Sequence, residues 1–174
     1  MTTEFEPRIY VACLAAYNNG YLHGAWIDAT DDLDSIQEQV STMLKSSPIS
    51  DAEEYAIHDY EGFGRVDIGE YIGLPQAHAL ALFIEEHLAI GALILDHVSG
   101  DLDDARDMTE RYCGTFTSVE AYAESIAHDI YDIPEQLTPY IDYEAMGYDM
   151  QVNGDIVALE EGAQAASVSV FFGP

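Results

Sequence analysis

The stretch RIYVACLAAYNNGYLHGAWIDA, residues Arg8–Ala29, decides how the chain begins to fold. Its two halves, Arg8–Ala16 and Tyr21–Ala29, are rich in the β-branched and aromatic side chains that favour strands. Between them, Tyr17-Asn18-Asn19-Gly20 indicates a hairpin turn, because Asn and Gly tolerate the positive φ that tight hairpin turns require. We therefore expect an antiparallel pair of strands at the start of the chain.

The residues that follow extend this sheet and cover it. Asp31 or Asp32 can cap a helix that runs to about Leu44, because an Asp side chain accepts a hydrogen bond from the free N–H groups of a first turn. Glu54–Tyr60 alternates between apolar and polar side chains, which is typical of a half-buried strand. The first part of the chain is thus expected to be a small antiparallel sheet with one helix.

Helical signals dominate the middle of the chain. A proline suits the first turn of a helix, and Pro75 opens the apolar stretch PQAHALALFIEEHL. Gly91 and Gly100 interrupt the pattern that follows, which predicts two further helices at about Ala92–Val98 and Leu102–Tyr112. We expect this part to be a bundle of short helices.

The last part mixes helices and strands. Ser118–Tyr131 has the apolar spacing of a helix, and Pro139 is expected to start another. The apolar face of the first helix is expected to consist of Val119, Tyr122, Ile126 and Ile130. Val152–Glu160 and Val168–Phe172 have the composition of strands, with Asn153-Gly154 as a turn.

The fold class predicted from these signals is α+β, in three small subdomains. They are a sheet-plus-helix subdomain over residues 1–62, a helical subdomain over residues 63–114, and a mixed α/β subdomain over residues 115–174. The segment Gly62-Phe63-Gly64 is the expected hinge between the first two.

Acidic side chains outnumber basic ones along the whole chain. There are 33 Asp and Glu against 5 Lys and Arg, a formal net charge of −28, and no Lys or Arg follows Arg111. Apolar residues make up 48% of the chain and aromatic residues 11%, which is enough for a core and unlike a disordered acidic tail. The charge must therefore lie on a folded surface, where like charges oppose folding. We infer that a function outside folding requires it.

The density of this charge is comparable to that of DNA. A compact domain of this length has a radius of gyration of about 16 Å and a diameter of about 40 Å, so its net charges are spaced at roughly one per 1.4 Å. Duplex DNA carries about one charge per 1.7 Å of its axis. A surface of this kind repels nucleic acids and anionic membranes and favours basic partners.

Targeting signals and cysteine usage are typical of a cytoplasmic protein. The N-terminal residues MTTEFEP lack the cationic and apolar regions of a signal peptide. No run approaches 18 apolar residues, so no transmembrane helix is expected. Cys13 and Cys113 stand alone without CxxC spacing, which favours buried thiols in a reducing compartment.

Motifs for metals, cofactors and catalysis are weak. Asp149–Glu160 matches the spacing of a calcium-binding loop at positions 1, 5, 6 and 12, with Gln151 at position 3. An EF-hand needs a helix on each side of its loop, however, and a plain hairpin at Asn153-Gly154 explains the same residues. The histidines show neither HExxH nor zinc-finger spacing, and no nucleotide-binding or nucleophile motif occurs. We expect no enzyme active site, no bound metal and no cofactor.

Strings of residues spread over nearly the whole chain carry a family resemblance. They are Ile9–Val11, Leu14–Gly20, Leu22, Gly24–Asp28, Glu54–Phe63, Gly100–Arg106, Tyr112, Tyr122–Glu124, Ile133–Leu137, Tyr140–Met146 and Asn153–Asp155. Together they closely resemble the ArdA antirestriction family.

This resemblance implies a DNA-mimic inhibitor carried on conjugative plasmids, transposons or phages. Such proteins occupy the DNA-binding groove of type I restriction–modification enzymes, formed by the methyltransferase core with its specificity subunit. The resemblance also implies an elongated chain of three small subdomains, and a homodimer joined through its C-terminal parts that imitates a bent duplex. Inhibition of this kind needs no chemistry.

The acids expected to form the mimic surface lie in the base-poor half of the chain, and several are like-charged neighbours on predicted helices. They are Asp101, Asp103, Asp104, Asp107, Glu110, Glu120, Glu124, Asp129, Asp132, Glu135, Asp142 and Glu144. Aromatic residues are enriched at subunit interfaces, so tyrosines are the expected dimer contacts. They are Tyr131, Tyr140, Tyr143 and Tyr148.

Two alternatives remain open from the sequence. The first is an acidic soluble domain of a salt-adapted organism, which the single lysine, Lys45, would fit. The second is a calcium-binding module that uses the Asp149–Glu160 loop.

Overall fold

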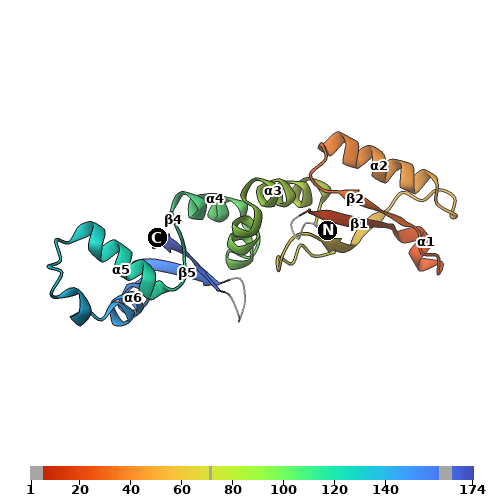
Figure 1. Ribbon diagram of the computed structural model, residues 1–174. Coiled ribbons are helices and arrows are strands. Elements are labelled where there is room, and N and C mark those ends of the chain that lie inside the picture. Colours follow the sequence, from red (N-terminus) through yellow and green to blue (C-terminus); the bar gives the residue numbers. More distant parts are fainter. Residues whose placement is uncertain (1–5, 71, 161–165) are drawn as a thin grey trace. The chain divides into compact units, whose positions relative to one another are not determined.

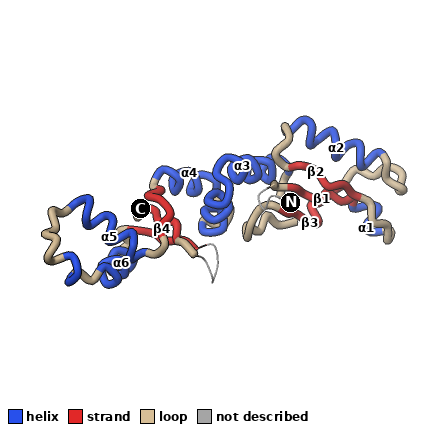
Figure 2. Tube along the Cα trace, viewed as in Figure 1, coloured by secondary structure: helices blue, strands red, loops and turns tan. Residues whose placement is uncertain are grey.

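The computed structural model describes residues 6–70, 72–160 and 166–174. The chain divides into two compact units, unit 1 (Met1–Ala105) and unit 2 (Arg106–Pro174). Helices are present in both units, and each unit has its own antiparallel sheet of three strands (Figures 1 and 2), which confirms the α+β class. The division into three subdomains, with a hinge at Gly62-Phe63-Gly64, stays a prediction.

Unit 1 is built on the sheet that the N-terminal strands predict. Strands β1 (Arg8–Cys13), β2 (Gly24–Asp28) and β3 (Tyr55–Glu61) lie in the order β2-β1-β3. The central strand β1 pairs antiparallel with β2 from Arg8–Asp28 to Ala12–Gly24, and antiparallel with β3. The predicted antiparallel pairing of the first two strands and the predicted third strand are therefore confirmed.

The connection between β1 and β2 is not the tight turn predicted at Tyr17–Gly20. Residues expected to continue the first strand instead form the short helix α1 (Leu14–Asn18). The Cys13 Sγ atom accepts a hydrogen bond from the Ala16 amide at 3.4 Å, and Gly20 closes the turn with a φ of 81°. Alanine strongly favours helix over strand, which explains why LAAYN leaves the sheet early.

Helix α2 (Leu33–Lys45) covers the sheet of unit 1. As predicted, Asp32 caps it, with Oδ1 accepting from the Ser35 amide at 3.1 Å. Its buried side chains are Ile36, Val40 and Met43, spaced as one helix face requires. The carbonyl of Met43 also contacts the His23 ring at 2.7 Å, which ties the end of the helix to the residues before β2.

Helix α3 (Leu74–His97) has Pro75 in its first turn, as predicted. The helical path is broken at Leu88, where φ is 54° and ψ is −135°. This confirms two helical stretches with a break between them, but the break lies at Leu88, where the first predicted stretch ends, and not at Gly91. Gly91 is instead buried, and an added Cβ would lie 3.0 Å from the carbonyl oxygen of Phe83. The close packing around Gly91 therefore explains that glycine better than a break does.

By length and composition alone, α3 could cross a membrane. The absence of a long uninterrupted apolar run does not indicate such a helix, because polar residues such as Glu85 and Glu86 interrupt the apolar stretch. Apolar side chains around α3, including Leu80, Ile84 and Ile94, are buried within the protein. This is the pattern of a central core helix, which is apolar on most sides.

Helix α4 (Leu102–Glu110) crosses from unit 1 into unit 2, where the order of elements becomes mixed. Helices α5 (Val119–Ile130) and α6 (Tyr143–Val152) accompany a sheet in the order β4-β6-β5. Its strands are β4 (Tyr112–Phe116), β5 (Ile156–Glu160) and β6 (Val168–Phe172). The sequence predicted α5, β5 and β6.

Three details of unit 2 correct the predictions. Strand β4 was missed, and Tyr112, expected to end a helix, begins it. Pro139 lies in a single turn of 3-10 helix (Thr138–Tyr140), while α6 begins after Asp142, whose Oδ1 accepts from the Ala145 amide at 2.9 Å. Val152, expected in a strand, ends α6.

The core of unit 2 lies between its sheet and α5. Tyr122 packs with Ile156, Val168 and Val170, and burial together with neighbouring Cys113 raises the pKa of its phenol to about 12. The expected apolar face of α5 is partly wrong, because Ile130 is exposed while Ala123 and Ala127 are buried. The small alanines let α6 pack close, with Tyr143 against them.

We predict that Gly147→Ala destabilises the protein. An added Cβ would lie 2.9 Å from Val119 Cγ1 and 3.1 Å from the Val119 carbonyl oxygen, where α6 meets the start of α5. Overpacking at such a contact costs about 1–3 kcal/mol, more than the gain of about 1 kcal/mol in helix propensity. Urea unfolding measures the change, with exposed Ser125→Ala on α5 as control. An unchanged or higher stability of Gly147→Ala would contradict the close packing.

Candidate functional site

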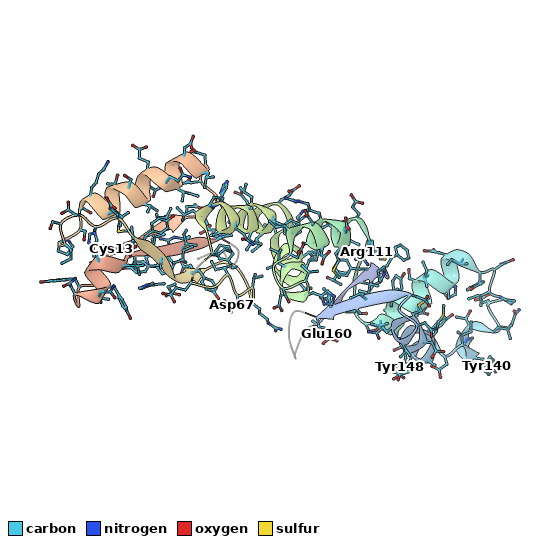
Figure 3. All side chains as sticks on the ribbon, turned by 180° about the vertical axis from the view of Figure 1, so that it is seen from behind. Cys13, Asp67, Arg111, Tyr140, Tyr148 and Glu160 are labelled. Carbon is cyan, nitrogen blue, oxygen red and sulfur yellow. The ribbon has the colours of Figure 1, made fainter. Side chains whose placement is uncertain are left out.

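Every Asp and Glu in the described parts of the chain is exposed. The strongly negative composition is therefore a property of the surface, as predicted, and both cores are apolar. Figure 3 shows the side chains of both units, with Asp67 and Glu160 among those labelled.

The acids predicted for the mimic surface are all exposed and lie on several elements of both units. Three precede the boundary at Ala105, and nine lie in unit 2. The helical ones belong to α4 (Asp103, Asp104, Asp107, Glu110), α5 (Glu120, Glu124, Asp129) and α6 (Glu144). The others are Asp101, Asp132, Glu135 and Asp142.

Several acids also hold the ends of helices. Asp101 Oδ1 accepts from the amides of Asp103 and Asp104, at 2.9 and 3.0 Å, and Asp142 caps α6 in the same way. Glu120 and Glu144 lie in the first turns of their helices. A negative charge near a helix N-terminus stabilises it by about 0.3–1 kcal/mol, which offsets part of the repulsion between acids.

Two of the few basic residues are engaged in holding the fold together. Arg8 Nη1 lies 3.1 Å from Glu61 Oε1, and the guanidinium lies 5.6 Å from the centre of the Trp26 ring. Arg111 donates from Nη1 to the Phe172 carbonyl at 3.0 Å, joining the start of β4 to the end of β6. The Arg111 guanidinium thus donates hydrogen bonds to main-chain oxygens.

The two units approach the charge density of DNA separately. Unit 1 contains 20 acidic and 3 basic residues, and unit 2 contains 13 and 2. Domains of these lengths are about 33 and 28 Å across, so net charges are spaced at roughly one per 2.0 Å and one per 2.6 Å. These spacings are wider than the one obtained by treating the whole chain as one compact domain, but they are still near the spacing of about 1.7 Å in duplex DNA.

Three of the four tyrosines predicted as dimer contacts are available on the surface. Tyr131, Tyr140 and Tyr148 are 60%, 85% and 65% exposed. Tyr143 is buried at 7% exposure, and its hydroxyl lies 3.3 Å from His128 Nε2. Tyr143 packs in the core of unit 2, so the exposed candidates for dimer contacts are the other three tyrosines.

The Asp149–Glu160 segment does not have the structure of an EF-hand. Its first residues end α6 and its last residues, Ile156–Glu160, form the strand β5, where an EF-hand loop would lead into its second helix. Within residues 6–70, 72–160 and 166–174, no three His, Cys, Asp or Glu side chains are placed to share a metal ion. Cys13 and Cys113 are both free thiols.

One feature of unit 1 was missed from the sequence, because no motif marks it. A cavity of about 340 Å³ lies between α1, β3 and the segment that follows β3. Its walls include Tyr17, His58, Tyr60, Asp67 and Glu70. Aromatic and acidic residues converge there from three separate parts of the chain, and only the fold brings them together.

Comparison with known proteins identifies the family. A family model described as antirestriction protein (ArdA) matches residues 9–165, from β1 through β5. A search of curated proteins finds no match. The matched region contains the exposed acids of α4, α5 and α6 and both free cysteines. The chain therefore belongs to the ArdA family of antirestriction proteins.

Proposed function

We propose that this protein inhibits type I restriction–modification enzymes by mimicking B-DNA. The observation that carries the proposal is the exposure of every described acid on two folded units, each with a charge spacing near that of a duplex. Membership in the antirestriction family supports the same conclusion. The partner is the methyltransferase core with its specificity subunit, in the cytoplasm.

Inhibition is competitive and involves no bond breaking. A DNA-binding groove presents Lys and Arg side chains to phosphates, and carboxylates at similar spacing pair with them and release bound counterions. Attraction over long range also speeds association. The protein reads no base sequence, so a single inhibitor blocks enzymes with different recognition sites.

A folded mimic has an advantage over the DNA that it replaces. Bending a duplex into a groove costs on the order of 1–10 kcal/mol, whereas carboxylates fixed on helices are already in place. Capping acids such as Asp101 and Asp142 are fixed further by their own hydrogen bonds to the backbone. Like charge also keeps the protein from binding nucleic acid itself.

We predict that the protein abolishes DNA binding and cleavage by a type I enzyme at equimolar dimer and moderate salt. The inhibition constant should rise steeply with salt, by about 10³–10⁵ between 50 and 200 mM if six to ten contacts release counterions. Competition for a labelled duplex measures both effects. Polyglutamate of equal total charge is the control for charge without a fold. Undiminished DNA binding and cleavage would contradict the proposal.

We predict that mimicry is distributed over many acids. Single changes of acid to amide among the proposed surface residues should weaken inhibition less than about threefold, because each removes one of many screened contacts. The double variant Glu124→Gln/Asp129→Asn should weaken inhibition further, yet be as stable as the wild type or more so by up to about 1 kcal/mol, because it relieves repulsion and an unfavourable charge near the end of α5.

Urea unfolding and duplex competition, measured on the same double variant, separate these two effects. Weaker inhibition accompanied by lost stability would mean that the α5 acids serve the fold, which contradicts their role in mimicry.

We propose further that the protein is a homodimer whose contacts include Tyr131, Tyr140 and Tyr148. Large exposed aromatic side chains are enriched at such interfaces. Sedimentation equilibrium should give the mass of a dimer for the wild type and of a monomer for Tyr140→Ser/Tyr148→Ser. Tyr21→Ser, at a tyrosine that is 54% exposed in unit 1, is the matched control and should stay dimeric. Equal dimer affinity in all three proteins would exclude these contacts.

A further inference from the structure

We propose that the cavity beside β3 is a specific site for one arginine side chain of the partner enzyme. This inference rests on the proposed function for the identity of the partner, but the chemistry of the site stands on unit 1 alone. It gives the otherwise diffuse negative surface one defined point of attachment.

The cavity combines aromatic walls with two carboxylates. Its volume of about 340 Å³ lies at the small end of ligand pockets, which typically measure about 300–1,000 Å³. Tyr17 comes from α1, His58 and Tyr60 from β3, and Asp67 and Glu70 from the segment before α3. Each carboxylate is exposed enough to meet a ligand from solvent.

Asp67 is fixed in position by its neighbours. Its Oδ1 accepts from the Gly69 amide at 2.9 Å and from the Tyr60 hydroxyl at 3.3 Å. Burial and the nearby Asp67 charge raise the pKa of Tyr60, so its hydroxyl remains a neutral donor. These two hydrogen bonds hold the carboxylate in place, so its orientation needs no reorganisation when a ligand enters.

The other wall is held by ring contacts. The Tyr17 ring meets the His58 ring edge to face, with centroids 4.7 Å apart and planes at 81°. His58 Nε2 in turn lies 3.6 Å from Glu70 Oε1. The second carboxylate is thus placed beside an ordered pair of rings.

A guanidinium group fits this lining best. Two carboxylates attract a cation, and the aromatic lining suits one whose charge is spread over a flat group. A planar guanidinium stacks on aromatic rings and donates to a carboxylate through two parallel N–H groups, which a lysine ammonium cannot do. A metal ion fits poorly, because among the described residues no three acidic, histidine or cysteine side chains are placed to share one.

The first experiment uses N-acetylarginine amide as the probe, with the uncharged citrulline analogue as control, and the full-length protein. Chemical shifts of the Gly69 amide, which donates to Asp67, report on occupancy. We expect saturable binding of the arginine probe and at least tenfold weaker binding of the citrulline analogue. Shifts spread evenly over all acidic segments, with none concentrated at Gly69, would overturn the proposal.

Matched variants test the lining residues. Glu70→Gln and Asp67→Asn should each weaken binding of the arginine probe about tenfold. The Asn side chain retains the oxygen that accepts from Tyr60 and Gly69. Glu38 is an exposed acid of α2, and Glu38→Gln, which makes the same change of charge, should alter probe binding less than twofold. Tyr17→Leu should weaken binding of the probe, whereas Tyr21→Leu, at a tyrosine of nearly equal exposure, should leave it unchanged. Equal effects in the two members of a pair would exclude the site.

The same variants in duplex competition separate this inference from the proposed function. Glu70→Gln should reduce inhibition of a type I enzyme about tenfold, against less than threefold for Glu38→Gln. If the wild type inhibits the enzyme and both variants lose inhibition equally, the arginine site is refuted and mimicry still stands. Probe binding without any wild-type inhibition would refute mimicry and leave a guanidinium site.

Discussion

Repulsion between like charges is the constraint on which the rest of this structure depends. A net charge of −28 opposes every compact state of the chain, and the described acids are kept on the surface, where water and salt screen them. The fold offsets the remaining cost locally. Acids occupy the N-terminal ends of α2, α4, α5 and α6, and Arg8 and Arg111 each join segments distant in the sequence. Part of the charge that we propose for binding thus also stabilises the fold.

Two small cores, rather than a single large one, support this surface. Each unit places helices against a three-stranded antiparallel sheet, and small residues allow the closest contacts. Ala123, Ala127 and Gly147 let α5 and α6 approach each other, which leaves the outer faces of both helices for acids. Thin layers of this kind expose a large share of their residues for their size, which suits the proposed action through surface charge.

Features governed by local chemistry could be predicted from the sequence. Asp32 caps α2 because a short polar side chain satisfies free amides, and Pro75 lies in a first turn for a similarly local reason. Features that depend on distant partners could not be predicted. Strand β4 exists because β6, more than 50 residues later, pairs with it, and Gly114 within it shows a φ of 135° that no strand pattern indicates. The acids of the surface were visible from composition, whereas the cavity beside β3 depends on tertiary contacts alone.

The double use of the capping acids has an evolutionary consequence. Asp32, Asp101 and Asp142 accept backbone hydrogen bonds, so replacing them weakens a helix whether or not a restriction enzyme is present. Glu124 and Asp129 lie further along α5, whose N-cap is Ser118, and therefore do not cap that helix. In a lineage released from selection for antirestriction, acids of the second kind should drift to neutral residues first, while the capping acids persist. The order of loss along a decaying lineage would then record which carboxylates served the inhibited enzyme and which served the fold.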